Sequence, residues 1–167
     1  GGVYAATPYD KDRDISCTYS LLRMKEELKK YAVKFSNYEG GVSLGSYLAD
    51  RAEHENMEYC SMYAFVPAYD FSQHSNQMQG FGIDRDYKAW YDLMRRFNHM
   101  FNLGINLSDL DRQSEELVIS MEAKIAELDR NMPQLKAREY LERLSKEFNE
   151  NSFMPLDDLW TTELEDI

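Results

Sequence analysis

Hydrophobic and polar positions along the first hundred residues predict strands that alternate with helices. Short apolar runs cover residues 3–7 and 31–35, and a longer run over residues 59–66 ends at a proline. An apolar run of this kind is typical of a strand covered on both faces. Residues 16–30 and 45–56 instead place apolar side chains three and four apart, which predicts amphipathic helices. This order predicts an α/β fold with a partly parallel sheet flanked by helices.

A polar loop over residues 69–81 separates this region from a further predicted helix. Asp84 is expected to cap that helix with its carboxylate. The apolar positions that repeat at three and four are Tyr87, Trp90, Tyr91, Met94, Phe97 and Met100. So broad an apolar face predicts a well-buried helix.

Two amphipathic helices beyond residue 105 predict a helical hairpin. Ser108 and Asp111 approximate a capping box, and Pro133 suits the first turn of the second helix. The apolar stripes are Leu110, Leu117, Met121, Ile125 and Leu128 in the first helix, and Leu135, Tyr140, Leu141, Leu144 and Phe148 in the second. These stripes are wide for an isolated hairpin, so they are expected to cover either the sheet domain or a second subunit.

The pattern divides the chain into three predicted parts. Residues 1–105 are the later half of an α/β domain, residues 106–150 a helical hairpin subdomain, and residues 151–167 an acidic and aromatic tail. The tail contains Phe153 and Trp160 but no basic residue. Its composition fits either a segment packed against its own domain or one held for a partner.

The net charge of −11 is unevenly distributed along the 167 residues. Residues 1–100 hold 12 Lys and Arg against 14 Asp and Glu, whereas residues 101–167 hold 7 against 16. Such a chain repels phosphate backbones, so nucleic acid is not expected as a partner. Keeping the protein soluble is the favoured role of this charge, ahead of forming an acidic docking surface.

The sequence contains no segment typical of a membrane helix or a secretory signal. Its longest apolar run is far shorter than the about 20 residues that span a bilayer. Cys17 and Cys60 are too few for a disulfide framework, which favours the reducing cytoplasm. The sequence starts at Gly1, without an initiator methionine and inside a strand-like run, so we expect an N-terminal portion to be missing.

A glycine loop precedes the predicted helix over residues 45–56. Gly40, Gly41 and Gly45 could present backbone N–H groups to an anion, because a helix N-terminus carries partial positive charge. The loop lacks the features of a nucleotide-binding P-loop and the spacing of the dinucleotide fingerprint, and Glu39 would repel a phosphate. A tight turn with close helix packing is the favoured interpretation.

Tyr69 and Asp70 follow the end of the longest predicted strand, where open α/β sheets bind their ligands. No nucleophile, base or second acid can be assigned beside them, so a loop-anchoring tyrosine and a turn aspartate are favoured. Together with the three glycines they form the candidate ligand or partner pocket.

No catalytic, cofactor-binding or metal-binding residue is assigned. The chain's three histidines, His54, His74 and His99, and its two cysteines lack the close paired spacing of a zinc or iron site. Neither a metal nor a cofactor is therefore expected.

The order of these motifs resembles the later half of the proteasome assembly chaperone family in its bacterial and archaeal branch. The resemblance rests on residues 37–40 (Asn-Tyr-Glu-Gly), on Gly45, and on residues 63–69 (Tyr-Ala-Phe-Val-Pro-Ala-Tyr), and it covers about residues 2–144. The chain departs from the family in having Ala68 where many relatives have histidine, and in a longer loop. Its last residues also lack the hydrophobic-tyrosine-any ending with which proteasome activators dock, so docking through the C-terminus is not expected.

The resemblance implies a phosphorylase-like α/β/α sandwich that self-associates, binds protein surfaces and has no established catalysis in bacteria. The leading hypothesis is therefore a non-enzymatic protein-binding or assembly protein, chaperone-like, cytoplasmic and homo-oligomeric. The alternative is an enzyme or sensor that binds nucleoside-like or phosphate-like molecules between residues 40–45 and residues 69–70. That alternative depends on fold analogy alone.

Overall fold

The computed structural model describes residues 2–36, 43–71 and 81–155. The strands are β1 (Gly2–Ala5), β2 (Ile15–Tyr19), β3 (Val33–Phe35), β4 (Cys60–Tyr69) and β5 (Phe81–Gly82). The α-helices are α1 (Lys25–Leu28), α2 (Leu44–His54), α3 (Tyr87–Phe101), α4 (Ser108–Asn131) and α5 (Ala137–Glu147), with 3-10 turns at Leu22–Met24, Lys29–Tyr31 and Pro133–Leu135. The chain therefore has the mixed α/β fold that the sequence predicts.

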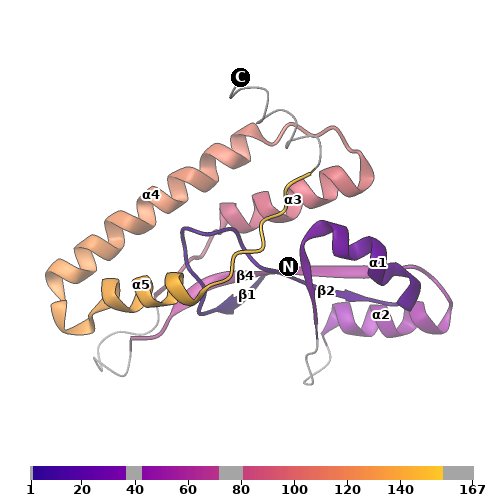
Figure 1. The fold of residues 1–167 in the computed structure, drawn as a ribbon, viewed down its shortest axis with the longest axis horizontal. Coiled ribbons are helices and arrows are strands. Elements are labelled where there is room, and N and C mark those ends of the chain that lie inside the picture. The colour runs from indigo at the N-terminus through magenta and orange to yellow at the C-terminus, as the bar shows by residue number, and fades with distance from the viewer. Residues whose placement is uncertain (1, 37–42, 72–80, 156–167) are drawn as a thin grey trace.

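The sheet is mixed, with strand order β1-β4-β2-β3 (Figure 1). β4 runs parallel to β1 and antiparallel to β2, and β3 is parallel to β2. β5 pairs in the antiparallel direction with the last residues of β4. The sheet is thus partly parallel, as predicted.

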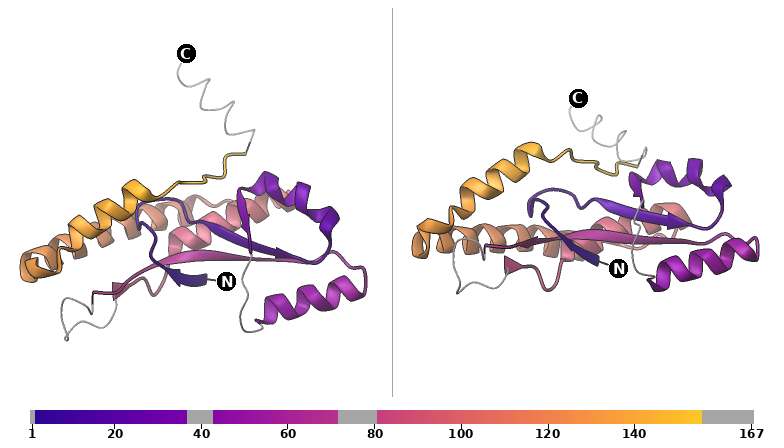
Figure 2. Two further views of the ribbon diagram at one scale, coloured as in Figure 1. Left: turned by 60° about the horizontal axis from the view of Figure 1, so that its bottom comes forward. Right: turned by 90° about the horizontal axis from the view of Figure 1, so that it is seen from below.

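Helices lie on both sides of this sheet. Met62 and Ala64 of β4 belong to the core that includes Leu28 of α1 and Ala89 of α3. The intervening residue Tyr63 faces α2, where it approaches Gly45. Figure 2 shows α1 and α2 on opposite sides of the sheet. These layers form an α/β/α arrangement, and its phosphorylase-like character stays a prediction.

β4 does not end at Pro67, which corrects the predicted strand end. The strand continues to Tyr69 and pairs Pro67 with Ala5 of β1. On its other side the Phe65 N–H donates to the Asp14 carbonyl, so by alternation the nitrogen of Pro67 points to the same side. That position lies beyond the first residue of β2, so the missing N–H costs the sheet no ladder bond.

Residues 15–19 form a strand, and the prediction that a helix begins at Ser16 is wrong. Ile15 and Cys17 are fully buried while Ser16 and Thr18 are only partly covered, which is the two-residue period of a strand. The helical segment begins only at Leu22 and ends at Ala32, whose φ of 48° stops it.

α3 begins after Asp86, not after Asp84. The Asp86 carboxylate accepts a hydrogen bond from the Ala89 N–H at 3.0 Å, which caps the helix. The buried residues of α3 include Asp92 and Arg96, whereas Trp90 is 47% exposed. The predicted apolar face is therefore displaced, because α3 turns two charged side chains toward the sheet.

The helical hairpin packs against the far end of β4. Met121 and Ile125 of α4 and Leu141 of α5 share a core with Tyr69 and Ile83. This confirms the two apolar stripes and shows that they cover the sheet domain. The start of α4 differs from the prediction, because the predicted capping box does not form. The Asn106 side chain instead accepts a hydrogen bond from the Ser108 N–H at 2.9 Å.

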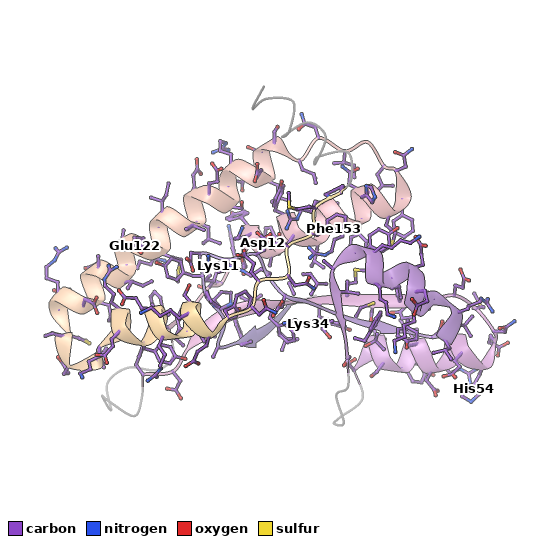
Figure 3. The ribbon with its side chains drawn as sticks, viewed as in Figure 1. Lys11, Asp12, Lys34, His54, Glu122 and Phe153 are labelled. Atoms are coloured by element: carbon purple, nitrogen blue, oxygen red, sulfur yellow. The ribbon has the colours of Figure 1, made fainter. Side chains whose placement is uncertain are left out.

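The described part of the tail returns to the core. Phe153 is buried and lies against the rings of Tyr31 and His99 (Figure 3). Up to residue 155 the tail therefore packs on its own domain. Residues 156–167, with Trp160, lie outside the described residues.

Candidate protein-interaction site at the sheet edge

β1 is the outer strand of the sheet, and its outer edge pairs with no other strand among the residues that the structure describes. Backbone N–H and C=O groups on such an edge can pair with another extended segment. Val3 is 48% exposed and Tyr4 is 64% exposed. The edge therefore combines unpaired backbone with exposed apolar side chains.

A groove of about 330 Å³ adjoins this edge on the side of α3. Gly2 and Tyr4 of β1 lie opposite Ala64 and Val66 of β4 in the strand register, on the face that α3 covers. The groove is lined by Gly2, Tyr4, Val66, Ile83, Asp84, Asp86, Ala89, Trp90 and Leu93. Its wall is largely apolar and aromatic, with two carboxylates.

Asp86 fixes the wall of the groove in position. Besides capping α3, its carboxylate accepts from Arg13 Nε at 2.8 Å and from Arg13 Nη2 at 3.2 Å. Both side chains are almost fully buried. Arg13 Nη1 also donates to the carbonyls of Pro8, Tyr9 and Lys11. The connection between β1 and β2 is thereby fastened to the first turn of α3.

Further ion pairs fasten the same connection along α3. Asp12 accepts from Lys88 at 3.0 Å and from Arg95 at 2.8 Å. Burial alone would raise the pKa of Asp12, but the two cations outweigh it and hold the pKa well below its usual value. The Arg13 N–H donates to Asp92 at 2.7 Å. The groove wall is therefore preorganised by buried charges.

The two carboxylates of the groove differ in their surroundings. Asp86 is paired with Arg13, whereas Asp84 lies at the exposed rim. A groove with Trp90 and Tyr4 beside one exposed carboxylate suits an apolar side chain next to a cationic one. The lining includes no cysteine, histidine or lysine. The lining residues can bind such side chains, and they include no nucleophile paired with a base.

The structure describes three of the five predicted pocket residues, namely Gly45, Tyr69 and Asp70. Gly40 and Gly41 lie outside the described residues. Gly45 sits at the start of α2, where an added Cβ would lie 2.8 Å from the Ser61 hydroxyl, so it has the close packing role favoured for it. Tyr69 is six residues beyond Tyr63 along β4, a span of about 20 Å. Gly45 and Tyr69 therefore do not meet in one pocket.

Tyr69 has a structural contact of its own. Its hydroxyl donates to the Thr7 carbonyl at 2.8 Å, and its ring is buried in the hairpin core. Burial raises its pKa, which keeps the phenol protonated. Asp70 is exposed. This agrees with the interpretation of Tyr69 as an anchoring residue.

Within the described ranges, no group of three or more His, Cys, Asp and Glu side chains could hold a metal ion. None of the described helices is long and apolar enough to cross a membrane. Neither finding adds a ligand to the groove.

Sequence reasoning did not identify the groove. The sequence predicts Trp90 on a well-buried helix face and Tyr4 in a short strand-like run, and Asp86 carries no signal beyond being near a helix start. Exposure of the edge depends on strand order, which no local pattern contains.

No protein-family model matches the chain, and no curated protein sequence matches it. Solved structures do match by fold. A PAC2 family protein from Streptomyces avermitilis aligns over 84% of this chain with a TM-score of 0.61 and 17% identity. A proteasome-assembly chaperone homologue from Mycobacterium tuberculosis aligns over 76% with a TM-score of 0.58 and 19% identity.

The alignment covers 50% of the Streptomyces chain and 48% of the Mycobacterium chain, so this chain spans about half the length of the structures it matches. The chain thus has the fold of PAC2 family proteins and proteasome-assembly chaperone homologues, which confirms the resemblance found in the sequence at the level of the fold.

Proposed function

We propose that this protein is a non-enzymatic, chaperone-like protein-binding factor that takes part in assembling protein complexes. The observation that carries the proposal is the edge of β1, which pairs with no other strand in the described part of the chain, beside an apolar groove. The binding groups are the β1 backbone, the rings of Tyr4 and Trp90, and the rim carboxylate of Asp84.

Strand addition is the binding mode that this surface suits. An extended segment that pairs with β1 would satisfy its outer N–H and C=O groups, and one of its side chains could enter the groove. Tyr and Trp are enriched among the residues that dominate binding energy at protein interfaces. The ion pairs of Asp86 and Asp12 hold the wall in place, which lowers the entropy lost on binding.

The neighbouring structures support an assembly role. One of them is described as a proteasome-assembly chaperone homologue, and that description belongs to the Mycobacterium protein. We extend to this chain only the general role of binding protein partners during assembly, including copies of itself, in the cytoplasm. The division into residues 1–105, 106–150 and 151–167 remains part of this proposal.

No observation on the described residues favours the small-molecule alternative. It requires residues 40–45 and 69–70 to share a pocket, whereas Gly45 of α2 packs beside Tyr63 and Tyr69 lies six residues further along β4. The groove at β1 has the apolar lining and open strand edge of a peptide site.

Affinity purification of the intact protein from its own cells tests the proposal. Tyr4→Asp and Trp90→Asp place a charge at the groove, while Ile119→Asp changes an equally accessible apolar residue on α4, 69% exposed. Each variant is first checked for unchanged unfolding midpoints. We expect the two groove variants to lose at least tenfold in recovered partner and Ile119→Asp to retain it.

Light scattering on the same variants measures self-association. If the partner is a second copy, the groove variants shift the oligomer toward monomer at concentrations where Ile119→Asp does not. Equal recovery and equal oligomeric state for all four proteins would refute binding through this edge.

A further inference from the structure

The two cysteines of the chain lie together on neighbouring strands. In the antiparallel register of β2 and β4, Cys17 pairs with Met62 and Cys60 pairs with Tyr19. Cys17 and Cys60 therefore occupy diagonal positions on the same sheet face, in the core shared with α1 and α3. The Cys17 thiol itself donates to the Thr18 carbonyl, at 3.8 Å.

The environments of the two thiols are unequal. Cys17 is 1% exposed, whereas Cys60 is half-buried at the first residue of β4. The neighbouring Cys17 thiol lowers the pKa of Cys60, and the same neighbourhood together with burial raises the pKa of Cys17. Cys60 therefore loses its proton more readily than Cys17, and the thiolate is the form that reacts as a nucleophile.

We propose that Cys17 and Cys60 form a peroxide-sensitive dithiol that closes to an intramolecular disulfide. The Cys60 thiolate attacks one oxygen of a hydroperoxide, the O–O bond breaks, and Cys60 becomes a sulfenic acid while the leaving oxygen takes up a proton as water or an alcohol. The Cys17 thiol then attacks the Cys60 sulfur, an S–S bond forms, and the sulfenic oxygen leaves as water. Two thiols are oxidised and one peroxide is reduced.

Strand geometry predicts that this disulfide is reversible. Diagonal Cα atoms are about 7–8 Å apart in a regular ladder, whereas disulfides usually join Cα atoms about 4.4–6.8 Å apart. Closing the bond therefore requires this end of the ladder to contract by about 1 Å, and a strained disulfide is easily reduced.

The Cα atoms of the two cysteines would move together at the end of the β2–β4 ladder, where the strands can accommodate the change. The Tyr19–Cys60 pair is the last of the β2–β4 ladder. Immediately beyond it, Ser20 Oγ donates to the Met57 carbonyl at 2.7 Å and accepts from the Tyr59 N–H at 2.9 Å. Oxidation should therefore alter these contacts and leave the groove at β1 in place.

Intact mass spectrometry of the reduced full chain, treated with hydrogen peroxide at pH 7, tests the proposal. We expect the mass to fall by two hydrogen atoms, the protein to keep its mobility as a single chain on a non-reducing gel, and dithiothreitol to reverse the change. An unchanged mass, a mixed population joined between chains, or accumulation of added oxygen without loss of hydrogens would each overturn it.

Two variants separate the roles of the thiols. Cys60→Ser should abolish the reaction. Cys17→Ser should leave a sulfenic acid on Cys60 that dimedone captures, and dimedone capture in wild type should be much weaker. Alkylation of native wild type by iodoacetamide provides an independent measurement, because its rate at Cys60 should rise with pH around a midpoint below that of an ordinary thiol. A midpoint near that of an ordinary thiol would contradict the proposal.

Discussion

The guanidinium of Arg96 lies over the ring of Phe153, 5.3 Å from its centre. Arg96 is fully buried and donates to the Tyr31 carbonyl at 2.7 Å and to the Asp92 carbonyl at 2.6 Å. Burial lowers the pKa of Arg96 to about 10, so it stays charged at neutral pH. The contact joins α3, the turn before β3 and the tail in a single cluster.

Phe153→Ala should lower the free energy of unfolding by about 3 kcal/mol, because it removes a buried ring and uncovers the Arg96 cation. Urea denaturation followed by circular dichroism measures the change. Met154→Ala is the matched control, since Met154 is 56% exposed, and it should change stability by less than about 0.5 kcal/mol. Equal effects of the two variants would mean that the tail is not anchored by Phe153.

Asp86→Ala should lower the free energy of unfolding by about 3–5 kcal/mol, because it leaves the Arg13 cation buried without its carboxylate and removes the cap of α3. Lys11→Ala provides the comparison. Its ion pair with Glu150 is 3.8 Å long and exposed, so the loss should be less than about 1 kcal/mol.

Adding Arg13→Met to Asp86→Ala should recover part of the lost stability, because no unpaired charge then remains in the interior. The recovery is incomplete, since the carbonyls of Pro8, Tyr9 and Lys11 lose their donor. If the two single variants were strictly additive, the Arg13–Asp86 pair would carry no coupling energy.

The contribution of Asp12 should depend on pH. Because Lys88 and Arg95 hold its folded pKa below the usual 3.8, the carboxylate stabilises the fold fully above that value, and this stability is lost as the pH falls through the folded pKa. Asp12→Asn should cost about 2 kcal/mol at pH 7. Unfolding of both proteins across the acid range should show the difference shrinking, and a constant difference would contradict the ion-pair explanation.

Gly45→Ala should destabilise the protein by about 1–3 kcal/mol, although alanine favours a helix, because the new methyl group overlaps the Tyr63 and Ser61 side chains. Thermal unfolding measures the loss. Tyr63→Phe removes the overlapping hydroxyl, so it should restore part of the stability in the double variant. A neutral Gly45→Ala would show that α2 does not pack closely on β4.

Much of the helical hairpin could be predicted because its signal is local. Met121 and Ile125 recur on one face of α4, and Leu141 does so on α5, so amphipathic period alone located the core positions. The same reasoning failed at Ile15 and Cys17, whose two-residue alternation was absorbed into the following helical pattern. A short strand next to a helix contains too few residues for its two-residue period to be distinguished from the helical period.

The candidate site was much less predictable. Arg13 is a charged residue in a polar segment, and only its partner Asp86, 73 residues away, explains its burial. Gly45 and Tyr69 were predicted to line one pocket, but Gly45 packs beside Tyr63, and the extended strand β4 carries Tyr69 six residues further on. The groove at Tyr4 and Trp90 lies beside the edge of β1 that pairs with no strand among the described residues.

The sequence by itself determined most of the element types, the apolar faces of the hairpin and the α/β class, because these follow from periodicity within one segment. Tertiary structure alone decided the strand order, the buried ion pairs of α3, the exposure of the β1 edge and the meeting of Cys17 with Cys60. Each of these is a contact between residues far apart in the chain, and such contacts are set by how whole elements share one core.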